Sequence, residues 1–134
     1  ALPFADAYGA QVGHAAGWPV ATDGKAHWLP HCPGIVGVGR NMPPDTGSGA
    51  ELYVVIGHGP RHLDRNIAAV GRVLSGIEWL SALPRGTGAL GVYERPEQHV
   101  KLVSARFAAD LPAAERPRFE VLRTGSPAFA RWVD

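Results

Sequence analysis

Short apolar runs separated by turn residues dominate the middle of the chain. Three such runs read GIVGV at residues 34–38, ELYVVI at 51–56 and IAAVGRV at 67–73. Runs of roughly four to eight β-branched and aromatic residues, bounded by Gly, Pro, Asn and Asp, are typical of strands. The sequence therefore predicts three strands here, the first two joined by the turn-rich surface loop 40–50.

One helix is predicted directly after the third of these strands. Ser75 and Glu78 have the spacing of a capping box, in which each side chain satisfies a backbone amide at the start of a helix. Apolar residues follow at helical spacing, and Pro84 with Gly86 ends the pattern. We expect this helix to run from Ser75 to about Leu83.

The remaining segments have weaker patterns. Residues 1–33 are rich in Gly, Ala, Pro and His without a sustained period, so we expect loops and at most one short strand. The run HVKLVSARF at 99–107 alternates imperfectly and predicts a last strand. The tail, 108–134, is interrupted by prolines but half apolar, and we expect it to pack on the body through Phe119, Val121, Leu122, Phe129 and Trp132.

Composition narrows the class of protein. The chain has 134 residues, of which 46% are hydrophobic, enough for the core of one domain. Its 17 Gly and 12 Pro are scattered, which favours a turn-rich, mainly β structure. A formal charge of +1 supplies no basic field for nucleic acid, and no apolar run reaches the roughly 18–20 residues of a membrane helix. Neither nucleic acid nor membrane is expected as a partner. The single cysteine excludes an internal disulfide and leaves the compartment open.

Several spaced motifs follow one another in a fixed order from about residue 33 to residue 83. They are a strand, a Gly/Pro-rich loop, the strand ELYVVIGH, the loop LDRN, a strand ending VGRV, and LSGIEWLSALPRG. This order resembles the second half of a cyclophilin-type peptidyl-prolyl cis-trans isomerase. It is most similar to a bacterial branch in which LPRGTGALGVYE and an AADLPAAERP tail also recur.

The resemblance implies a mainly β fold, a cyclophilin-like antiparallel β-barrel with one or two helices. In a single such domain, residues 1–33 form a loop-rich segment, 34–107 the matched barrel region and 108–134 the C-terminal tail. Cyclophilins close eight strands, and their catalytic arginine precedes the part matched here. The first arginine in this chain is Arg40. We therefore expect the N-terminal half of the barrel to be absent from the chain, and that missing part to be a partner for the open sheet edges.

The function implied is acceleration of X-Pro bond rotation during protein folding. The barrier is roughly 18–20 kcal/mol, and the family lowers it without a cofactor by binding a twisted amide. The expected partners are proline-containing segments of client proteins, in the periplasm or outside the cell, with the cytoplasm as the alternative. Because no residue here matches the donor arginine, the catalytic residue stays unassigned. A catalytically weak module that binds proline-containing peptides is the alternative function.

The resemblance also implies six substrate-binding residues. Tyr53 and Leu63 fall at positions of the proline pocket, and Glu51 falls where a glutamine usually grips the substrate backbone. An ionised carboxylate can accept but cannot donate there. His62 stands where the family frequently has a tryptophan, and Ile67 stands where it often has a histidine. Asn41 falls at the strand end that offers backbone groups to the substrate. The alternative interpretation is that Tyr53 is an aromatic residue of the core and Glu51 a solvated residue at the edge of the sheet.

This assignment makes a geometric prediction. Tyr53, Leu63 and Ile67 converge on one apolar pocket, and Glu51 projects from the same face as Tyr53 because strand side chains alternate. Three side chains of the loop between Tyr53 and Ile67 are expected outside the pocket, on its solvent-exposed rim. Two further polar residues of this loop are expected to be ordinary turn formers. The rim residues are His58, Arg61 and Arg65, and the turn formers are Asp64 and Asn66.

The histidines raise a metal hypothesis, which the sequence does not favour. His27 and His31 lie four residues apart beside Cys32, and His58 and His62 have the same spacing. That spacing makes a chelating pair on a helix, whereas both pairs lie among Gly and Pro. We expect no metal site. A nucleophilic pair of Cys32 and His31 lacks a visible third group to orient it.

Overall fold

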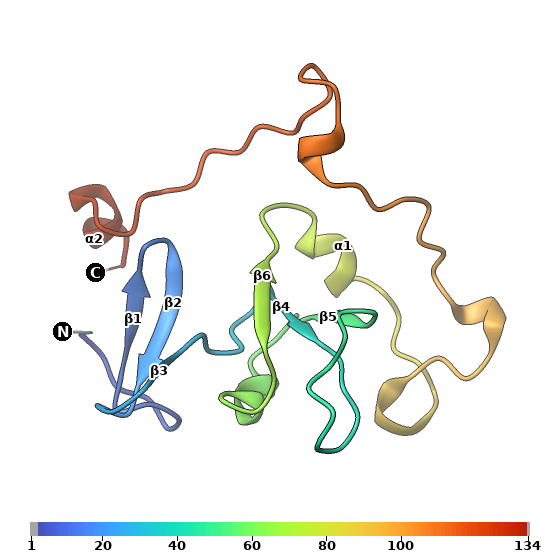
Figure 1. Ribbon diagram of the computed structural model, residues 1–134, viewed down its shortest axis with the longest axis horizontal. Coiled ribbons are helices and arrows are strands. Elements are labelled where there is room, and N and C mark those ends of the chain that lie inside the picture. The colour runs from blue at the N-terminus through green and yellow to red at the C-terminus, as the bar shows by residue number, and fades with distance from the viewer. Residues whose placement is uncertain (1–2, 134) are drawn as a thin grey trace. The chain divides into compact units, whose positions relative to one another are not determined.

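Two small antiparallel sheets form the main body of the structure, a computed structural model that describes residues 3–133 (Figure 1). The first sheet has the order β1-β2-β3 and the second the order β5-β4-β6. Their strands are β1 (Gln11–Ala15), β2 (Trp18–Thr22), β3 (His27–Trp28), β4 (Ile35–Val38), β5 (Leu52–Val54) and β6 (Ala69–Arg72).

The second sheet confirms the three strands predicted from the apolar runs, each somewhat shorter than its run. β4 lies in the centre, with Gly37 opposite Tyr53 of β5 and opposite Ala69 of β6. The register shifts between Val36 and Gly37 on the β6 side. A mainly β, antiparallel structure with helices is confirmed, and over residues 3–133 the strands form two open sheets without closing a barrel.

The first sheet corrects the reading of residues 1–33 as loops with at most one short strand. Strands β1 and β2 form a hairpin in which Ala15 pairs with Trp18. The two residues between them, Ala16 and Gly17, both have positive φ, at 49° and 87°. Two-residue turns of this kind match the twist of the flanking strands. The hairpin was missed because its strands contain Gly and Ala where a buried strand usually carries large side chains.

The buried core is small and lies around β4. Ile35 and Val38 of β4 are buried together with Val55, which follows β5, and Ala21 of β2. Backbone bonds extend the β4–β5 ladder past its assigned end, since Val55 N–H donates to the Ile35 carbonyl at 2.8 Å. The branched side chains of the run GIVGV therefore supply half of the buried apolar residues in the described chain.

The segment Glu78–Glu120 forms a compact unit separate from the one that contains both sheets. The predicted helix is present as α1 (Ile77–Ser81) and ends earlier than expected. The predicted strand at 99–107 is wrong: this stretch pairs with no strand in the described chain, and Leu102 and Phe107 are each 79% exposed. An apolar run without a neighbouring strand gains no ladder of hydrogen bonds. Short 3₁₀ turns complete this unit: η2 (Ala89–Gly91), η3 (Pro96–Gln98) and η4 (Ala108–Asp110).

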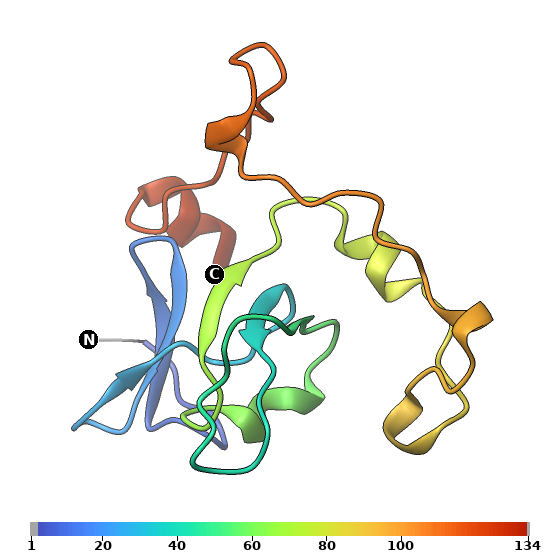
Figure 2. The ribbon, with the colours of Figure 1, turned by 45° about the vertical axis from the view of Figure 1, so that its right-hand side comes forward.

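The C-terminal segment belongs to the unit that holds the sheets. It ends in α2 (Pro127–Val133), which lies beside the β1–β2 hairpin in both views (Figures 1 and 2). The rings of Phe129 and His14 meet edge to face with centroids 5.1 Å apart, and Gly17 N–H donates to the Thr124 hydroxyl at 2.9 Å. Phe129 is thus the tail aromatic that contacts the hairpin, while Trp132 is 75% exposed.

We predict that Gly37→Ala destabilises the fold while Gly71→Ala does not. A Cβ at residue 37 would overlap the Tyr53 ring, whereas one at residue 71 would meet Val36 at an ordinary 3.7 Å. Overpacking of this kind typically costs about 1–3 kcal/mol. Chemical denaturation of both variants measures the difference in free energy of unfolding. Equal midpoints for Gly37→Ala and the wild type would contradict the placement of Tyr53 over β4.

Candidate functional site

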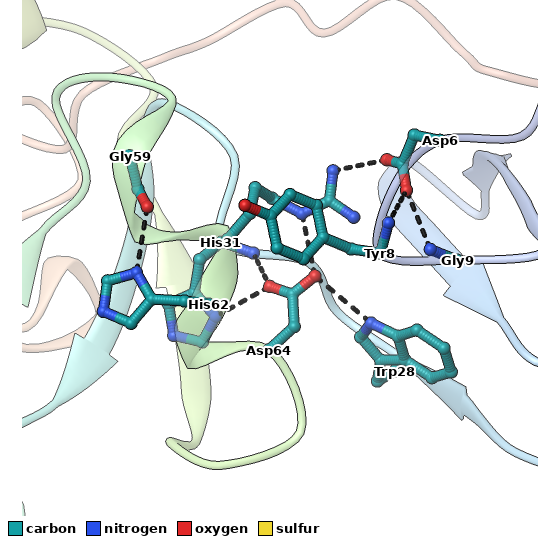
Figure 3. Close-up of polar contacts among 9 residues, drawn as sticks. Asp6, Tyr8, Gly9, Trp28, His31, Gly59, His62 and Asp64 are labelled. Atoms are coloured by element: carbon teal, nitrogen blue, oxygen red, sulfur yellow. Dashed lines mark hydrogen bonds and ion pairs between the residues drawn. The ribbon is translucent and has the colours of Figure 1, made fainter.

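The carboxylate of Asp64 is the centre of the polar cluster in Figure 3. Asp64 directly follows the 3₁₀ turn η1 (Gly59–Leu63), and its side chain is 5% exposed. Oδ1 accepts from the backbone N–H of His31 at 2.7 Å and lies 3.2 Å from His31 Nδ1. Oδ2 accepts from Trp28 Nε1 at 3.3 Å and from Arg61 Nε at 2.8 Å. Three donors and the His31 ring therefore converge on one loop carboxylate.

His31 connects Asp64 to the second sheet. Its side chain is fully buried, and Nε2 lies 2.8 Å from the Tyr53 hydroxyl. The two rings are stacked, with centroids 6.1 Å apart and planes 16° apart. Partial burial raises the pKa of the Tyr53 phenol above its usual value, so the hydroxyl keeps its proton at neutral pH. The result is a continuous chain of hydrogen bonds from Asp64 through His31 to Tyr53.

Arg61 extends the cluster toward the N-terminal segment. Its guanidinium donates to Asp64 and, through NH1, to Asp6 at 2.6 Å, and it lies 5.1 Å from the centroid of the Tyr8 ring. The prediction that Arg61 lies on the solvent rim is wrong, because its side chain is only 14% exposed. Two carboxylates and an aromatic face offset part of the cost of burying the charge, while Nη2 is buried without a hydrogen-bond partner in the described chain.

The other two rim residues lie where the sequence predicted. His58 is exposed, and the Arg65 side chain is 56% exposed. Arg65 pairs with Asp23 at 3.0 Å, and its guanidinium lies 5.0 Å from the centroid of the Trp28 ring.

Among the six predicted substrate-binding residues, Glu51 and Tyr53 share one face of the second sheet. The Tyr53 ring covers Gly37 and the Glu51 side chain covers Gly39, so both project from the same side of β4. Gly39 N–H also donates to the Glu51 carbonyl at 2.8 Å, which continues the ladder past β5. The common face follows from the two-residue repeat of a strand.

Three of the other residues lie in the η1 loop, which we define as residues 59–67. Leu63 is half-buried, and its carbonyl accepts from Ile67 N–H at 3.1 Å. Ile67 lines a shallow hollow of about 280 Å³ together with Trp28 and Leu29. His62 is exposed, with Nδ1 3.0 Å from the Gly59 carbonyl oxygen.

The sixth residue, Asn41, lies at the start of the loop after β4. It is exposed, and its N–H donates to Asp45 at 2.8 Å. Tyr53 directs its hydroxyl toward His31, whereas Ile67 lines the hollow beside Trp28. Convergence of Tyr53, Leu63 and Ile67 on one proline pocket therefore stays a prediction.

The histidines of the metal hypothesis have different surroundings. His27 is exposed on β3, while His31 is buried and occupied by Asp64 and Tyr53. Over residues 3–133 no group of three His, Cys, Asp or Glu side chains has the arrangement of a metal site. Burial raises the pKa of the Cys32 thiol, which disfavours the nucleophilic thiolate.

Sequence reasoning missed the role of Asp64 and of its partners. The sequence indicates Asp64 only as a turn former, because Asp is common in loops, and His31 only as a metal ligand or as the base of a nucleophilic pair. Their hydrogen bond joins residues 33 positions apart, and Trp28 lies 36 positions from Asp64. No local period links residues at such separations. The sequence signal for this cluster is a loop aspartate next to an arginine, and that pair is too common in loops to identify a site.

Comparison with known families identifies the class of protein. The model of the cyclophilin type peptidyl-prolyl cis-trans isomerase/CLD family matches residues 5–107. The chain belongs to this family, so its class is that of an isomerase acting on X-Pro bonds. The match extends further toward the N-terminus than the motifs at 33–83, and it includes the first sheet. No curated protein matches the chain.

None of the described helices is long and apolar enough to span a membrane.

We predict that Asp6 contributes to the acid dependence of stability. The hydrogen bond from Arg61 holds the pKa of Asp6 below its ordinary value of 3.8. A carboxyl whose pKa is lower in the folded state stabilises the fold above the unfolded pKa, and this contribution is lost as the pH falls through the folded value. The pair is partly exposed, so we expect about 0.2–1 kcal/mol.

Unfolding of wild type and Asp6→Asn at about pH 5 and about pH 3 measures this contribution. The variant should be less stable at the higher pH and should lose less stability on acidification. Asp110→Asn, in the separate 78–120 unit, is the control and should keep the wild-type dependence. Identical acid dependence of Asp6→Asn and wild type would contradict the role of this pair.

Proposed function

We propose that the chain binds X-Pro segments on the face of the second sheet that carries Glu51 and Tyr53, beside the η1 loop. The single observation behind this proposal is that both side chains cover glycines on one side of β4. Family membership supplies the reaction, and this face supplies an aromatic ring next to a backbone-gripping carboxylate. Such a site needs no nucleophile, because weakening the amide resonance requires only tighter binding of the twisted bond.

Each residue has a distinct part in this proposal. The Tyr53 ring and Leu63 contact the proline ring, and Glu51 accepts a hydrogen bond from a substrate amide. His62 and Ile67 border the site from the η1 loop, and the backbone at Asn41 pairs with the extended substrate. The substrates are flexible, proline-containing segments of unfolded client proteins.

The donor that catalysis needs has no clear candidate on this face. The first arginine, Arg40, donates to the Asn41 carbonyl and to the Asn66 side chain. Arg61 donates to Asp6 through Nη1 and to Asp64 through Nε, and its remaining nitrogen, Nη2, is buried. We therefore propose that the donor arginine belongs to a further part of the barrel outside this chain. The open edges of the two sheets support the same view.

The alternative is a module that binds proline-containing peptides and isomerises them slowly. This alternative is favoured because the side chains of Arg40 and Arg61 already donate hydrogen bonds within the chain. Both readings place the peptide on the Tyr53 face, so binding alone does not separate them, and the rate of isomerisation does.

The bacterial branch and a periplasmic or secreted location are further parts of the proposal. Both rest on the resemblance of the motifs ELYVVIGH and LPRGTGALGVYE. Fractionation of the source cells, with detection of the protein in each fraction, tests the location.

We predict that a tetrapeptide with one proline binds the Tyr53 face. Titration followed by amide NMR shifts should perturb residues 51–53 and 62–67, and the same peptide with alanine in place of proline should not. Leu63→Ala should weaken binding about tenfold or more, since a buried leucine contributes about 1.5–3 kcal/mol. Leu90→Ala is the matched control, because Leu90 is fully exposed in the separate unit. Perturbation confined to residues 78–120 would contradict this site.

Exchange NMR of the bound peptide then separates isomerase from binding module. We expect the 134-residue chain to accelerate cis-trans exchange only weakly, because its arginines near the site are occupied. Full isomerase turnover by this chain would show that the donor is present and would refute the proposal that it lies elsewhere.

A further inference from the structure

The hydrogen-bond pattern around Asp64 fixes the proton positions on His31. Two carboxylate oxygens provide about four acceptor positions. Three of them are filled by donors of fixed direction, the His31 backbone N–H, Trp28 Nε1 and Arg61 Nε, and the His31 ring faces Oδ1 through Nδ1 at 3.2 Å. A carboxylate can only accept, so we infer that Nδ1 carries the proton of this hydrogen bond.

The same pattern sets the direction of the next bond. Arg61 supplies one cation that Asp64 shares with Asp6. With the single ring proton on Nδ1, Nε2 has a lone pair that can accept from the Tyr53 O–H at 2.8 Å. The phenol proton of Tyr53 is therefore directed into the protein, away from any substrate.

Tyr53 is consequently held at two points. Its hydroxyl is bonded to the fully buried His31, and its ring covers Gly37, where even a methyl group would overlap it. A ring restrained in this way presents a fixed surface without paying the entropy of ordering when a ligand arrives. A phenylalanine at this position would lack the hydroxyl that fixes its far end.

We propose that His31 and Asp64 are positioning residues that hold the Tyr53 ring as the wall of the proline site, an inference that rests on the proposed function. The first sheet and its connection to β4 thereby fix the orientation of Tyr53 without contacting the substrate themselves. His31 comes from the segment between β3 and β4, and Trp28 of β3 supports the same carboxylate. Because Asp64 follows η1, one carboxylate sets both the tyrosine and the loop that carries Leu63.

The tautomer is tested first, without any ligand. Long-range ¹H–¹⁵N NMR spectra of the histidine rings in the 134-residue chain report which nitrogen is protonated. We expect the proton of His31 on Nδ1, and we expect Tyr53→Phe to shift the Nε2 signal of His31 but not the ring signals of the exposed His27. A proton on Nε2 in the wild type, or no shift in Tyr53→Phe, would overturn the proposal.

The effect on the site is measured with the proline tetrapeptide. We expect Tyr53→Phe and His31→Gln each to weaken binding about three- to tenfold, as for the loss of one hydrogen bond. The double variant should be no weaker than either single variant, because both act through the same bond. His27→Gln is the control and should bind as the wild type does.

The outcomes separate the positioning role from a structural one. A purely structural role would lower the unfolding midpoint of Tyr53→Phe and leave its peptide affinity unchanged, which would overturn the proposal. If His31→Gln does not fold, Tyr53→Phe alone decides, since it removes one hydroxyl and keeps the ring. Failure of the wild type to bind the tetrapeptide would overturn the proposed function and this inference with it, while the His31 tautomer would still show whether the hydrogen-bond chain exists.

Discussion

The Asp64 carboxylate is the interaction on which the rest of the main body depends. Burying a charge is costly unless hydrogen bonds and an opposite charge compensate it, and Asp64 has three donors, including Arg61, and the His31 ring. These donors come from the first sheet, from the connection to β4 and from η1. Few apolar side chains are fully buried in the described chain, and the polar centre joins segments that the small apolar core does not.

A second constraint is the absence of side chains at one position of β4 and at the residue that directly follows it. Gly37 and Gly39 leave room for Tyr53 and Glu51 to lie across the strand. Glycine weakens a strand in isolation, because it adds entropy to the unfolded chain and no side chain to the packing. Here the neighbouring strand supplies the missing surface. Gly37 and Gly39 thus determine which side chains form the candidate face.

The sequence predicted what local pattern determines. Strands β4 and β6 follow from branched residues and turn signals, and α1 begins close to the predicted start at Ser75. Two errors have opposite causes. The β1–β2 hairpin is held by a turn at Ala16 and Gly17 and by pairing, which its weak apolar pattern does not show. The stretch 99–107 has apolar residues but no partner strand in the described chain.

The polar centre was beyond local reasoning for a different reason. Each of its bonds to the N-terminal segment joins residues more than thirty positions apart, and its members are individually ordinary. The common face of Glu51 and Tyr53, by contrast, follows from their two-residue spacing and was predictable. What sequence could not give is the direction of the Tyr53 hydroxyl, because its acceptor His31 is fixed by the fold.

That direction explains how a phenol fits beside the apolar face proposed for substrate. A hydroxyl turned toward the substrate would add a donor beside the proline ring, whereas a buried hydroxyl without a partner would be costly. His31 removes both problems by accepting the proton inside the protein. His31 in turn needs Asp64 to hold its Nδ1 proton, and Asp64 needs Arg61 and Trp28. The position of the Tyr53 hydroxyl therefore depends on residues of two other segments, the connection between β3 and β4 and the η1 loop.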